Sequence, residues 1–207
     1  MTPPRLTSSS LAEWIRRDAA GRARYLFGLV GPPGSGKSTI AATLARDLGA
    51  PIAPLDGFHL PNSTLDSRGL RGVKGAPQTF ASLEFADAIR RLRAATEDVL
   101  MPDFDRTTDE PRPDRIRLSA SEKIIIVEGN YLLLDRDPWS TLKEWFDAVA
   151  YVDIDHEVRI ARLIARHVQF GKTPEAAATF VRKSDERNTE IIEAARHRSD
   201  LFVEDST

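Results

Sequence analysis

The sequence has 207 residues, 41% of them hydrophobic, which is typical of one domain with a full hydrophobic core. Its 29 basic and 31 acidic residues give a net charge of −2, which excludes the strong positive field of a nucleic-acid or anionic-membrane binder. The absence of cysteine excludes disulfides, thiolate metal sites and thiol catalysis. No apolar run approaches a membrane span and the N-terminal segment is charged, so we expect a cytoplasmic protein with neither a membrane nor a nucleic-acid partner.

The hydrophobic pattern predicts strands and helices in alternation. Strands are expected where short apolar runs occur, at 24–30, 52–55, 123–134, 148–154 and 201–203, with a further strand starting at 99. Helices are expected where apolar residues recur at helical spacing, at 11–20, 37–48, 80–97, 138–146, 156–168 and from 174 onwards. A capping box of Ser10 and Glu13 starts the first helix. This alternation favours a three-layer α/β/α fold with a mainly parallel sheet.

The segment 31–39 fits the pattern of a phosphate-binding loop, Gly-x-x-x-x-Gly-Lys-Ser/Thr, placed between a predicted strand and a predicted helix. Its glycines let successive N–H groups converge on phosphate oxygens, and the dipole of the following helix favours the same anion. Lys37 would contact the outer phosphates, and the Ser38 hydroxyl would bind magnesium. An ordinary Gly-rich surface turn is the alternative. The predicted nucleotide ligands are Gly31, Gly34, Ser35, Gly36, Lys37, Ser38 and Thr39.

The motif suggests a division of one predicted domain, 1–207, into four parts. They are an N-terminal helix (1–21), a nucleotide-binding core (24–154), a helical lid (155–173), and a C-terminal helix with a last strand (174–207). Two polar segments rich in turn formers, 60–79 and 103–113, interrupt the pattern. Long loops in a compact domain are usually functional or disordered.

Two carboxylates follow predicted strands that should end beside the phosphate-binding loop. Asp56 could accept the proton of an acceptor hydroxyl or orient the magnesium shell, and a turn former before Gly57 is the alternative. Glu128 could bind magnesium, and a buried carboxylate paired with a lysine or arginine is the alternative.

Three arginines, Arg159, Arg162 and Arg166, recur at helical spacing and should share one face. Such a helix could close over the phosphates and place positive charge on the transferred group. A solvated basic face paired with Asp155 and Glu157 would have the same pattern.

Candidate acceptor contacts lie in the two polar segments. His59 follows Asp56 by three residues, and Phe104 and Arg106 lie in the second segment. Asp185 and Asn188 are one helical turn apart, and we expect them to lie on an ordinary surface.

Together these segments resemble a family of small-molecule kinases. They fall in the order found in uridine kinase, phosphoribulokinase and type I pantothenate kinase. The likeness covers about 24–203, and the segments that carry it are 31–39, 55–59, 127–131 and 159–167. Asp-Gly-Phe at 56–58 with Pro61 and Asn62 is most similar to pantothenate kinase. The compact size and Val-Glu-Gly-Asn-Tyr at 127–131 look more like kinase-like proteins named as fructose transport system kinases.

The resemblance implies a P-loop nucleoside triphosphate hydrolase fold and an ATP:alcohol phosphotransferase that uses Mg²⁺. The roles it carries over are the phosphate ligand Lys37, the magnesium ligands Ser38 and Glu128, the base Asp56, and the lid arginines Arg162 and Arg166. The second acceptor segment departs from uridine kinase, which has Tyr-Asp-Phe and a nearby histidine where this sequence has Phe104-Asp105-Arg106 and Asp109. The acceptor therefore stays open among sugars, pantothenate-like and nucleoside-like molecules, and a homodimer is compatible with the sequence.

A regulatory or switch protein that binds ATP with little turnover is the alternative function. The sequence has neither the Asn-Lys-x-Asp motif of guanine-nucleotide switches nor the Leu-Ser-Gly-Gly-Gln segment of transporter motor ATPases. Intact Lys37, Ser38, Asp56 and Glu128 favour the kinase.

Overall fold

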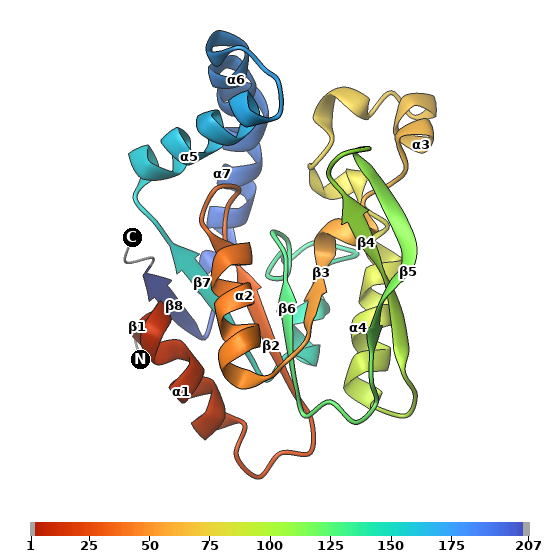
Figure 1. Ribbon diagram of the computed structural model, residues 1–207, viewed down its shortest axis with the longest axis vertical. Helices are drawn as coiled ribbons and strands as arrows, with labels where there is room; N and C mark the ends of the chain where they lie inside the picture. Colours follow the sequence, from red (N-terminus) through yellow and green to blue (C-terminus); the bar gives the residue numbers. More distant parts are fainter. Residues whose placement is uncertain (1–2, 205–207) are drawn as a thin grey trace.

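The computed structural model describes residues 3–204, so the outermost ends of the predicted domain lie outside the described residues. Its main sheet has six strands in the order β1-β8-β7-β2-β6-β3, and every neighbouring pair is parallel (Figure 1). The strands are β1 (Arg5–Thr7), β2 (Tyr25–Val30), β3 (Ile52–Pro54), β6 (Ile124–Glu128), β7 (Ala148–Asp153) and β8 (Leu201–Glu204). The predicted α/β fold with a mainly parallel sheet is confirmed.

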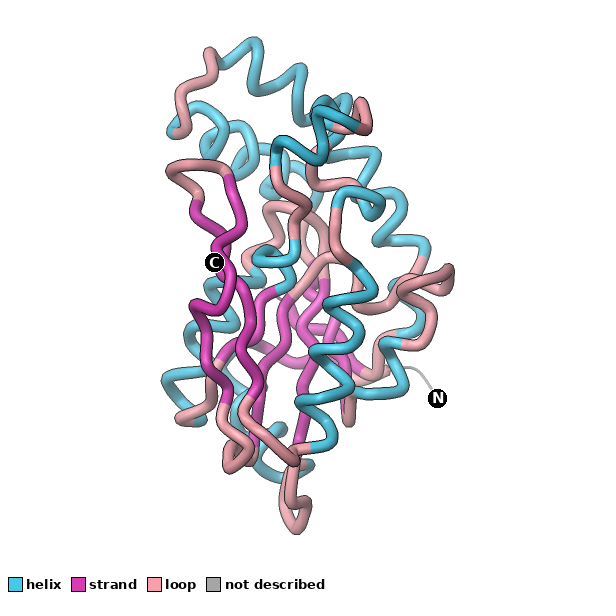
Figure 2. Tube along the Cα trace, turned by 90° about the vertical axis from the view of Figure 1, so that its right-hand side faces the viewer, coloured by secondary structure: helices cyan, strands magenta, loops and turns pink. Residues whose placement is uncertain are grey.

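Helices cover both faces of this sheet, while others lie beyond its upper end (Figures 1 and 2). The helices of the described residues are α1 (Ser8–Asp18), α2 (Lys37–Leu48), α3 (Asn62–Ser67), α4 (Ser82–Ala94), α5 (His156–Gln169), α6 (Pro174–Phe180) and α7 (Glu186–Ala194). Strand β2 is buried on both faces, because Phe27 and Leu29 pack with apolar residues of α1 and α2, while Leu26 and Val30 pack with those of α4 and α7. Within residues 3–204, no helix combines the length and apolar character that crossing a bilayer requires.

A separate antiparallel hairpin lies beside the main sheet. It pairs β4 (Val99–Asp105) with β5 (Glu110–Leu118). Sequence analysis predicts only the start of β4 and a polar segment after it, so β5 is missing from the prediction. The reason is composition: β5 contains Pro111 and Pro113 and is largely polar, which is unusual in a central strand but tolerated in a two-stranded ribbon.

Several predicted elements are wrong. Instead of a helix at 138–146 there is a single 3₁₀ turn, Leu142–Trp145, and residues 131–134 form turns rather than a continuation of β6. The 131–134 run is apolar because it fills the core beneath the sheet, not because it pairs with a strand. Thr7, whose hydroxyl accepts a hydrogen bond from Ser10 N, caps α1, so the predicted box of Ser10 and Glu13 does not form.

Two further segments have more structure or more breaks than expected. The polar segment 60–79 contains α3 and two 3₁₀ turns, Arg71–Val73 and Pro77–Thr79. The helix expected from 174 onwards is divided into α6 and α7 by a π-helical turn, Val181–Asp185. Turns of this kind inside helices are frequent at functional sites.

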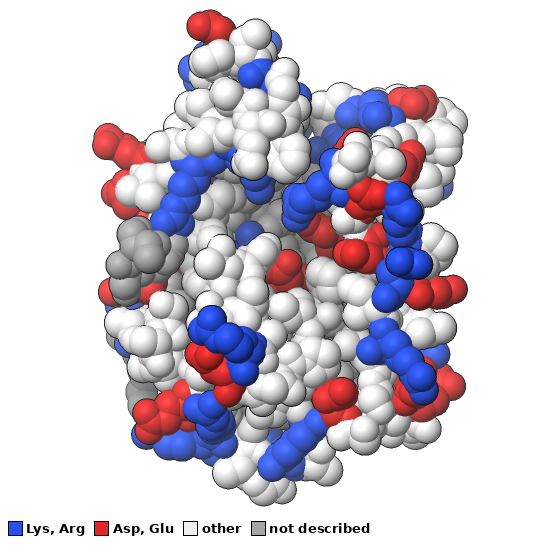
Figure 3. All heavy atoms as spheres, viewed as in Figure 1, with Lys and Arg blue, Asp and Glu red and all other residues white. Residues whose placement is uncertain are grey.

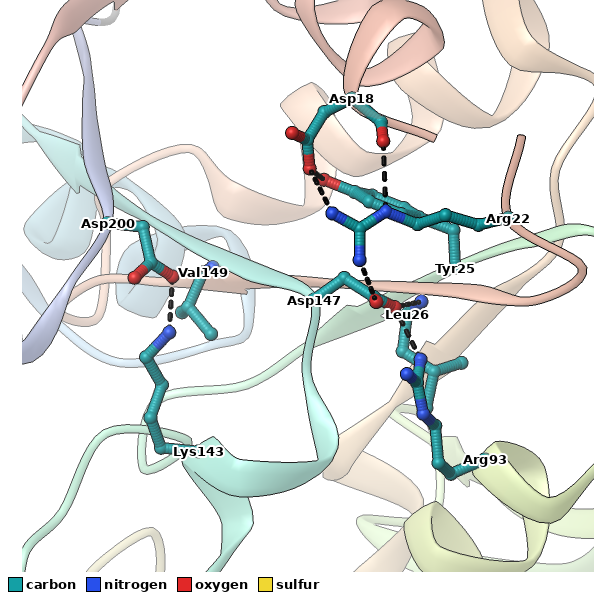
Figure 4. A network of polar contacts seen from close by, with 9 residues as sticks. All are labelled: Asp18, Arg22, Tyr25, Leu26, Arg93, Lys143, Asp147, Val149 and Asp200. Atoms are coloured by element: carbon teal, nitrogen blue, oxygen red, sulfur yellow. Dashed lines mark hydrogen bonds and ion pairs between the residues drawn. The ribbon is translucent and has the colours of Figure 1, made fainter. Parts of the chain in front are cut away.

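A buried carboxylate, Asp147, joins three parts of the fold near the amino ends of β2 and β7. Its side chain is 2% exposed, accepts a hydrogen bond of 2.8 Å from Leu26 N, and forms ion pairs with Arg22 and Arg93 (Figure 4). Asp147 therefore ties the segment before β7 to β2 and to the last turn of α4.

Replacing Asp147 by alanine is expected to lower the free energy of unfolding by about 1–3 kcal/mol, because Leu26 N–H loses its buried acceptor and Arg22 and Arg93 each lose one ion pair. Urea denaturation followed by circular dichroism measures this change. Asp87→Ala is the matched control, because its pair with Arg90 is exposed and should contribute less than about 1 kcal/mol. Equal losses in the two variants would contradict the structural role of Asp147.

Candidate active site

Three adjacent strands end side by side and carry the predicted site residues. The phosphate-binding loop follows β2, Glu128 is the last residue of β6, and Asp56 comes two residues after β3. In the parallel register, Glu128 lies beside Leu29 of β2 and Pro54 of β3. The carboxyl edge of a parallel sheet is where such folds bind ligands, and the predicted residues are brought together there.

The phosphate-binding loop has the backbone that its sequence predicts. Gly34 and Gly36 have φ angles of 80° and 85°, and Gly36 caps α2 without any side-chain hydrogen bond to the first turn. The N–H groups at the start of α2 can therefore bind an anion. A Cβ on Gly34 would lie 2.8 Å from Leu163 Cγ and 3.0 Å from the Arg159 carbonyl oxygen, so only glycine lets the loop pack this closely against α5.

Lys37 points back across this loop. Its Nζ donates a hydrogen bond of 3.0 Å to the Pro32 carbonyl oxygen. Burial lowers the pKa of Lys37 to about 8, the charges of Glu128 and Asp56 oppose this change, and Arg166 adds to it. A lysine in this setting is surrounded by the groups expected to bind a nucleotide.

Glu128 and Ser38 form a candidate magnesium site. Ser38 Oγ donates a hydrogen bond of 3.2 Å to Glu128 Oε1, whereas Glu128 Oε2 is buried without a hydrogen-bond partner among the described residues. Burial raises the pKa of Glu128, Asp56 raises it further, and Lys37 opposes the shift. An unpaired buried oxygen is costly, so a bound cation would stabilise this arrangement. The Ser35 hydroxyl is buried and unpaired as well.

The donor set suits magnesium better than a metal that needs several protein ligands. No group of three or more metal-binding side chains occurs in the described part of the chain. Mg²⁺ commonly takes one or two carboxylate or hydroxyl ligands from the protein and the others from phosphates and water. Ser38 and Glu128 therefore fit a magnesium ion that accompanies a nucleotide.

Asp56 faces this site from a 3₁₀ turn, Leu55–Phe58, that follows β3. Its Oδ2 accepts a hydrogen bond of 2.8 Å from Arg106 Nη2, and no residue within 3–204 donates to its Oδ1. The turn is held tightly against the hairpin, because a Cβ on Gly57 would lie 2.0 Å from the Pro102 carbonyl oxygen. Asp56 is thus rigidly placed, with one carboxylate oxygen available.

The predicted acceptor residues surround Asp56. The ring of His59 lies between Phe80 and Phe104, at centroid distances of 4.0 and 4.8 Å. Its Nδ1 is 2.8 Å from the Asp56 carbonyl oxygen, and burial lowers the pKa of His59, which favours the neutral ring. A neutral ring that donates from Nδ1 has Nε2 as a hydrogen-bond acceptor.

Sequence analysis does not single out Lys74, although it lies in this wall. Its Nζ is 2.7 Å from Asn62 Oδ1, 2.9 Å from Asp109 Oδ2, and 5.0 Å from the centroid of the Phe104 ring. These contacts attach the 60–79 segment to the tip of the hairpin. No local pattern marks such a lysine, since its partners are far away in the sequence.

The three arginines of α5 do not share one exposed face. Arg159 is 1% exposed, forms an ion pair with Glu186, and donates a hydrogen bond of 3.1 Å to Thr189 Oγ1. Arg159 therefore anchors α5 to α7 and is not part of a solvated basic face. Arg162 is partly buried, and Arg166 is exposed at the site. Desolvation lowers the pKa of Arg166, and so does the nearby charge of Arg106.

The expected surface position of Asp185 and Asn188 is wrong as well. Their exposed fractions are 7% and 6%, and Asp185 Oδ2 lies 2.9 Å from His167 Nε2. Asp185 faces inward because the π-helical turn packs against α5, whereas Asn188, on α7, lies against the 72–78 segment. Figure 3 shows the site as a hollow between the helices α5–α7 and the hairpin, with basic and acidic side chains along its rim.

Comparison with known proteins gives consistent results. The model of the Phosphoribulokinase / Uridine kinase family matches residues 26–206. A protein from Schizosaccharomyces pombe, provisionally named as a uridine kinase, is 34% identical over 195 residues, which cover 87% of this chain and 83% of that protein. A crystal structure from Silicibacter sp. TM1040, provisionally named as a fructose transport system kinase, has 35% identity and a TM-score of 0.89, and covers 95% of this chain and 98% of that one.

A more distant structure shows the same fold. YFH7 from Saccharomyces cerevisiae is similar with a TM-score of 0.85 and 21% identity, over 96% of this chain and 98% of that one.

Proposed function

The chain belongs to the phosphoribulokinase and uridine kinase family, and on this basis we propose that it is an ATP-dependent kinase that phosphorylates a hydroxyl group of a small metabolite. The family resemblance predicted from the sequence is thereby confirmed. The observation that carries the proposal is the position of Asp56, which lies beside Lys37, Ser38 and Glu128 at the carboxyl edge of the sheet. A protein that only binds ATP would need the nucleotide site but no carboxylate such as Asp56 beside it.

In the proposed reaction, the loop amides, the N-terminus of α2 and Lys37 bind the phosphates of ATP. Ser38 and Glu128 would hold Mg²⁺, and the unpaired Glu128 oxygen supports this assignment. The magnesium ion, when bound, neutralises charge on the phosphate oxygens. Thr39, at the start of α2, would bind the phosphates next to the loop.

Asp56 accepts the proton of the acceptor hydroxyl at Oδ1, while Arg106 holds Oδ2. The hydroxyl oxygen forms a bond to the γ-phosphorus, the bond from that phosphorus to the bridging oxygen breaks, and ADP leaves with the electron pair. Arg162 and Arg166 stabilise the negative charge of the transferred group, with α5 as part of a lid at 155–173. His59 and Phe104 bind the acceptor next to Asp56.

An ADP-release screen tests this function. The protein is incubated with ATP, Mg²⁺ and a metabolite library containing sugars, sugar phosphates, pantothenate-like acids and nucleosides. We expect release above the acceptor-free rate for one of these classes, loss of release when EDTA removes Mg²⁺, and phosphorylated product by mass spectrometry. Tight ATP binding with no acceptor-dependent release in any class would instead favour an ATP-binding regulatory protein.

A further inference from the structure

A cavity of about 660 Å³ lies between the 72–78 segment and the α6–α7 region. Val73, Ala76, Phe180 and Ile191 form its apolar walls, and Gln78 and Ser184 add polar groups. Its volume lies within the range of small-molecule sites. It has no role in binding the phosphates of ATP, because none of its lining residues belongs to the loop at 31–39.

The cavity is positively charged. Arg136, Lys183 and Arg187 line it, whereas Glu175 is its one acidic residue within the described part of the chain. None of the three basic side chains has an ion-pair or hydrogen-bond partner among residues 3–204. Most other arginines are paired, including Arg106 with Asp56. All three side chains are exposed, and it is their convergence on one cavity that favours a negatively charged ligand.

Asn188 provides a second observation on the cavity, one that does not depend on the charge of its lining. Asn188 is 6% exposed and lines the cavity, yet its side chain has no hydrogen-bond partner within the described residues. Its Nδ2 would lie 3.9 Å from a Cβ on Gly75, which shows how closely the 72–78 segment approaches α7. The amide of Asn188 is not among the fully buried polar groups without a partner, so it remains accessible in the cavity and can hydrogen-bond a ligand there.

The buried ring of Tyr131 connects the cavity with the phosphoryl acceptor site. Its hydroxyl donates a hydrogen bond to the Gly75 carbonyl oxygen, and its ring packs edge-on against Phe80, which also contacts His59. Burial raises the pKa of Tyr131, the nearby charge of Arg136 lowers it, and that of Asp56 raises it. Tyr131 therefore lies between the residues around Asp56 and the 72–78 segment that lines the cavity.

We propose that the cavity binds an anionic group of the acceptor, a phosphate or a carboxylate, through Arg136, Lys183, Arg187 and Asn188. This inference rests on the proposed kinase function and narrows its acceptor to a small metabolite that carries a negative charge away from the reacting hydroxyl. The apolar walls contact the carbon skeleton between the two ends. A neutral sugar or nucleoside would leave the three cations unpaired.

Binding measurements test the proposal without requiring turnover. The protein is first saturated with Mg²⁺ and a non-hydrolysable ATP analogue, so that anions cannot bind at the phosphate-binding loop. It is then titrated by calorimetry with a hexose 6-phosphate, a pentose 5-phosphate, a hexonate, pantothenate, glucose and uridine. We expect saturable binding of at least one anionic compound, and affinity at least tenfold lower for the neutral compounds.

Variants identify the site. Arg136→Ala, Lys183→Ala and Arg187→Ala should each lower affinity for the bound anion about tenfold, the effect of one lost charge-assisted hydrogen bond. Asn188→Asp, which keeps the size of the side chain but adds a negative charge, should lower it at least as much. Arg115→Ala is the matched control, because Arg115 is exposed and unpaired among the described residues but does not line the cavity.

Three outcomes are decisive. Equal affinity for anionic and neutral compounds would overturn the proposal, as would losses in the cavity variants no larger than in Arg115→Ala. Binding of carboxylates alone or of phosphates alone would support it and identify the anion. If anions bind through these residues but no acceptor is phosphorylated in the ADP-release screen, the kinase function fails while the anion site stands.

Discussion

Replacing Asp56 by asparagine is expected to lower kcat by a factor of about 10²–10⁴, the usual contribution of a general base. Asparagine has nearly the same shape and can still accept a hydrogen bond from Arg106 at its amide oxygen, so the turn after β3 should keep its position. It cannot take up the proton of the acceptor hydroxyl. The affinity for ATP should change by only a few-fold, because the Asp56 side chain forms no hydrogen bond with the phosphate-binding loop.

Coupled ADP release gives kcat, and fluorescence titration with an ATP analogue gives the affinity. Asp103→Asn is the matched control: Asp103 is an exposed aspartate of β4 whose side chain, among residues 3–204, accepts a hydrogen bond only from its neighbour Phe104 N, and its replacement should leave kcat within twofold. Full activity of Asp56→Asn would refute the assignment of the base. A parallel loss of ATP affinity would assign Asp56 to the magnesium shell instead.

Replacing Lys37 by alanine is expected to weaken ATP binding about 10- to 100-fold and to lower kcat about 10²-fold or more. The lysine supplies a charge-assisted contact both to the bound phosphates and to the charge that develops on the transferred group. Unchanged titration against ATP would refute its place in the phosphate site.

The lysine should also give ATP binding a characteristic pH dependence. Burial lowers the pKa of Lys37 to about 8, so the side chain of the free protein is protonated below this pH and increasingly neutral above it. ATP binding needs the charged form, and affinity in the wild type should therefore fall as pH rises from about 8, by up to about tenfold per unit. In Lys37→Ala this part of the pH dependence should disappear.

A control separates this effect from a general loss of positive charge. Lys123 is exposed and precedes β6, at the edge of the sheet opposite to the phosphate-binding loop. Lys123→Ala should therefore keep both the ATP affinity and its decline above pH 8. A Lys37→Ala protein with an unchanged pH profile would show that another group titrates.

Local sequence signals predict the nucleotide half of the site well. The loop at 31–39 combines a fixed motif with a buried strand before it and a helix after it, and each of these is set by residues within a short window. Glu128 and Asp56 are predictable because the carboxyl ends of parallel strands meet at one edge. Their positions need only the strand assignments of β2, β3 and β6, which the apolar runs supply.

The acceptor half depends on contacts between distant segments, which no local pattern reveals. From its local sequence, Arg159 is expected to be a surface arginine, because its partner Glu186 belongs to another helix. Lys74 owes its position to Asp109, on the hairpin. Asn188 is buried because the 72–78 segment lies over it. The proline-rich composition of β5 hides the strand that carries this side of the site.

The edge of the sheet has a consequence for chain connectivity. Strand β1 pairs with β8, with Arg5 opposite Phe202 and Thr7 opposite Glu204, so the two ends of the described chain lie side by side (Figure 1). A linker of a few residues could join them without disturbing the sheet, and new ends could then be opened in an exposed loop far from the site. The architecture therefore depends on which strands are neighbours, and it should survive a circular permutation of their order along the chain.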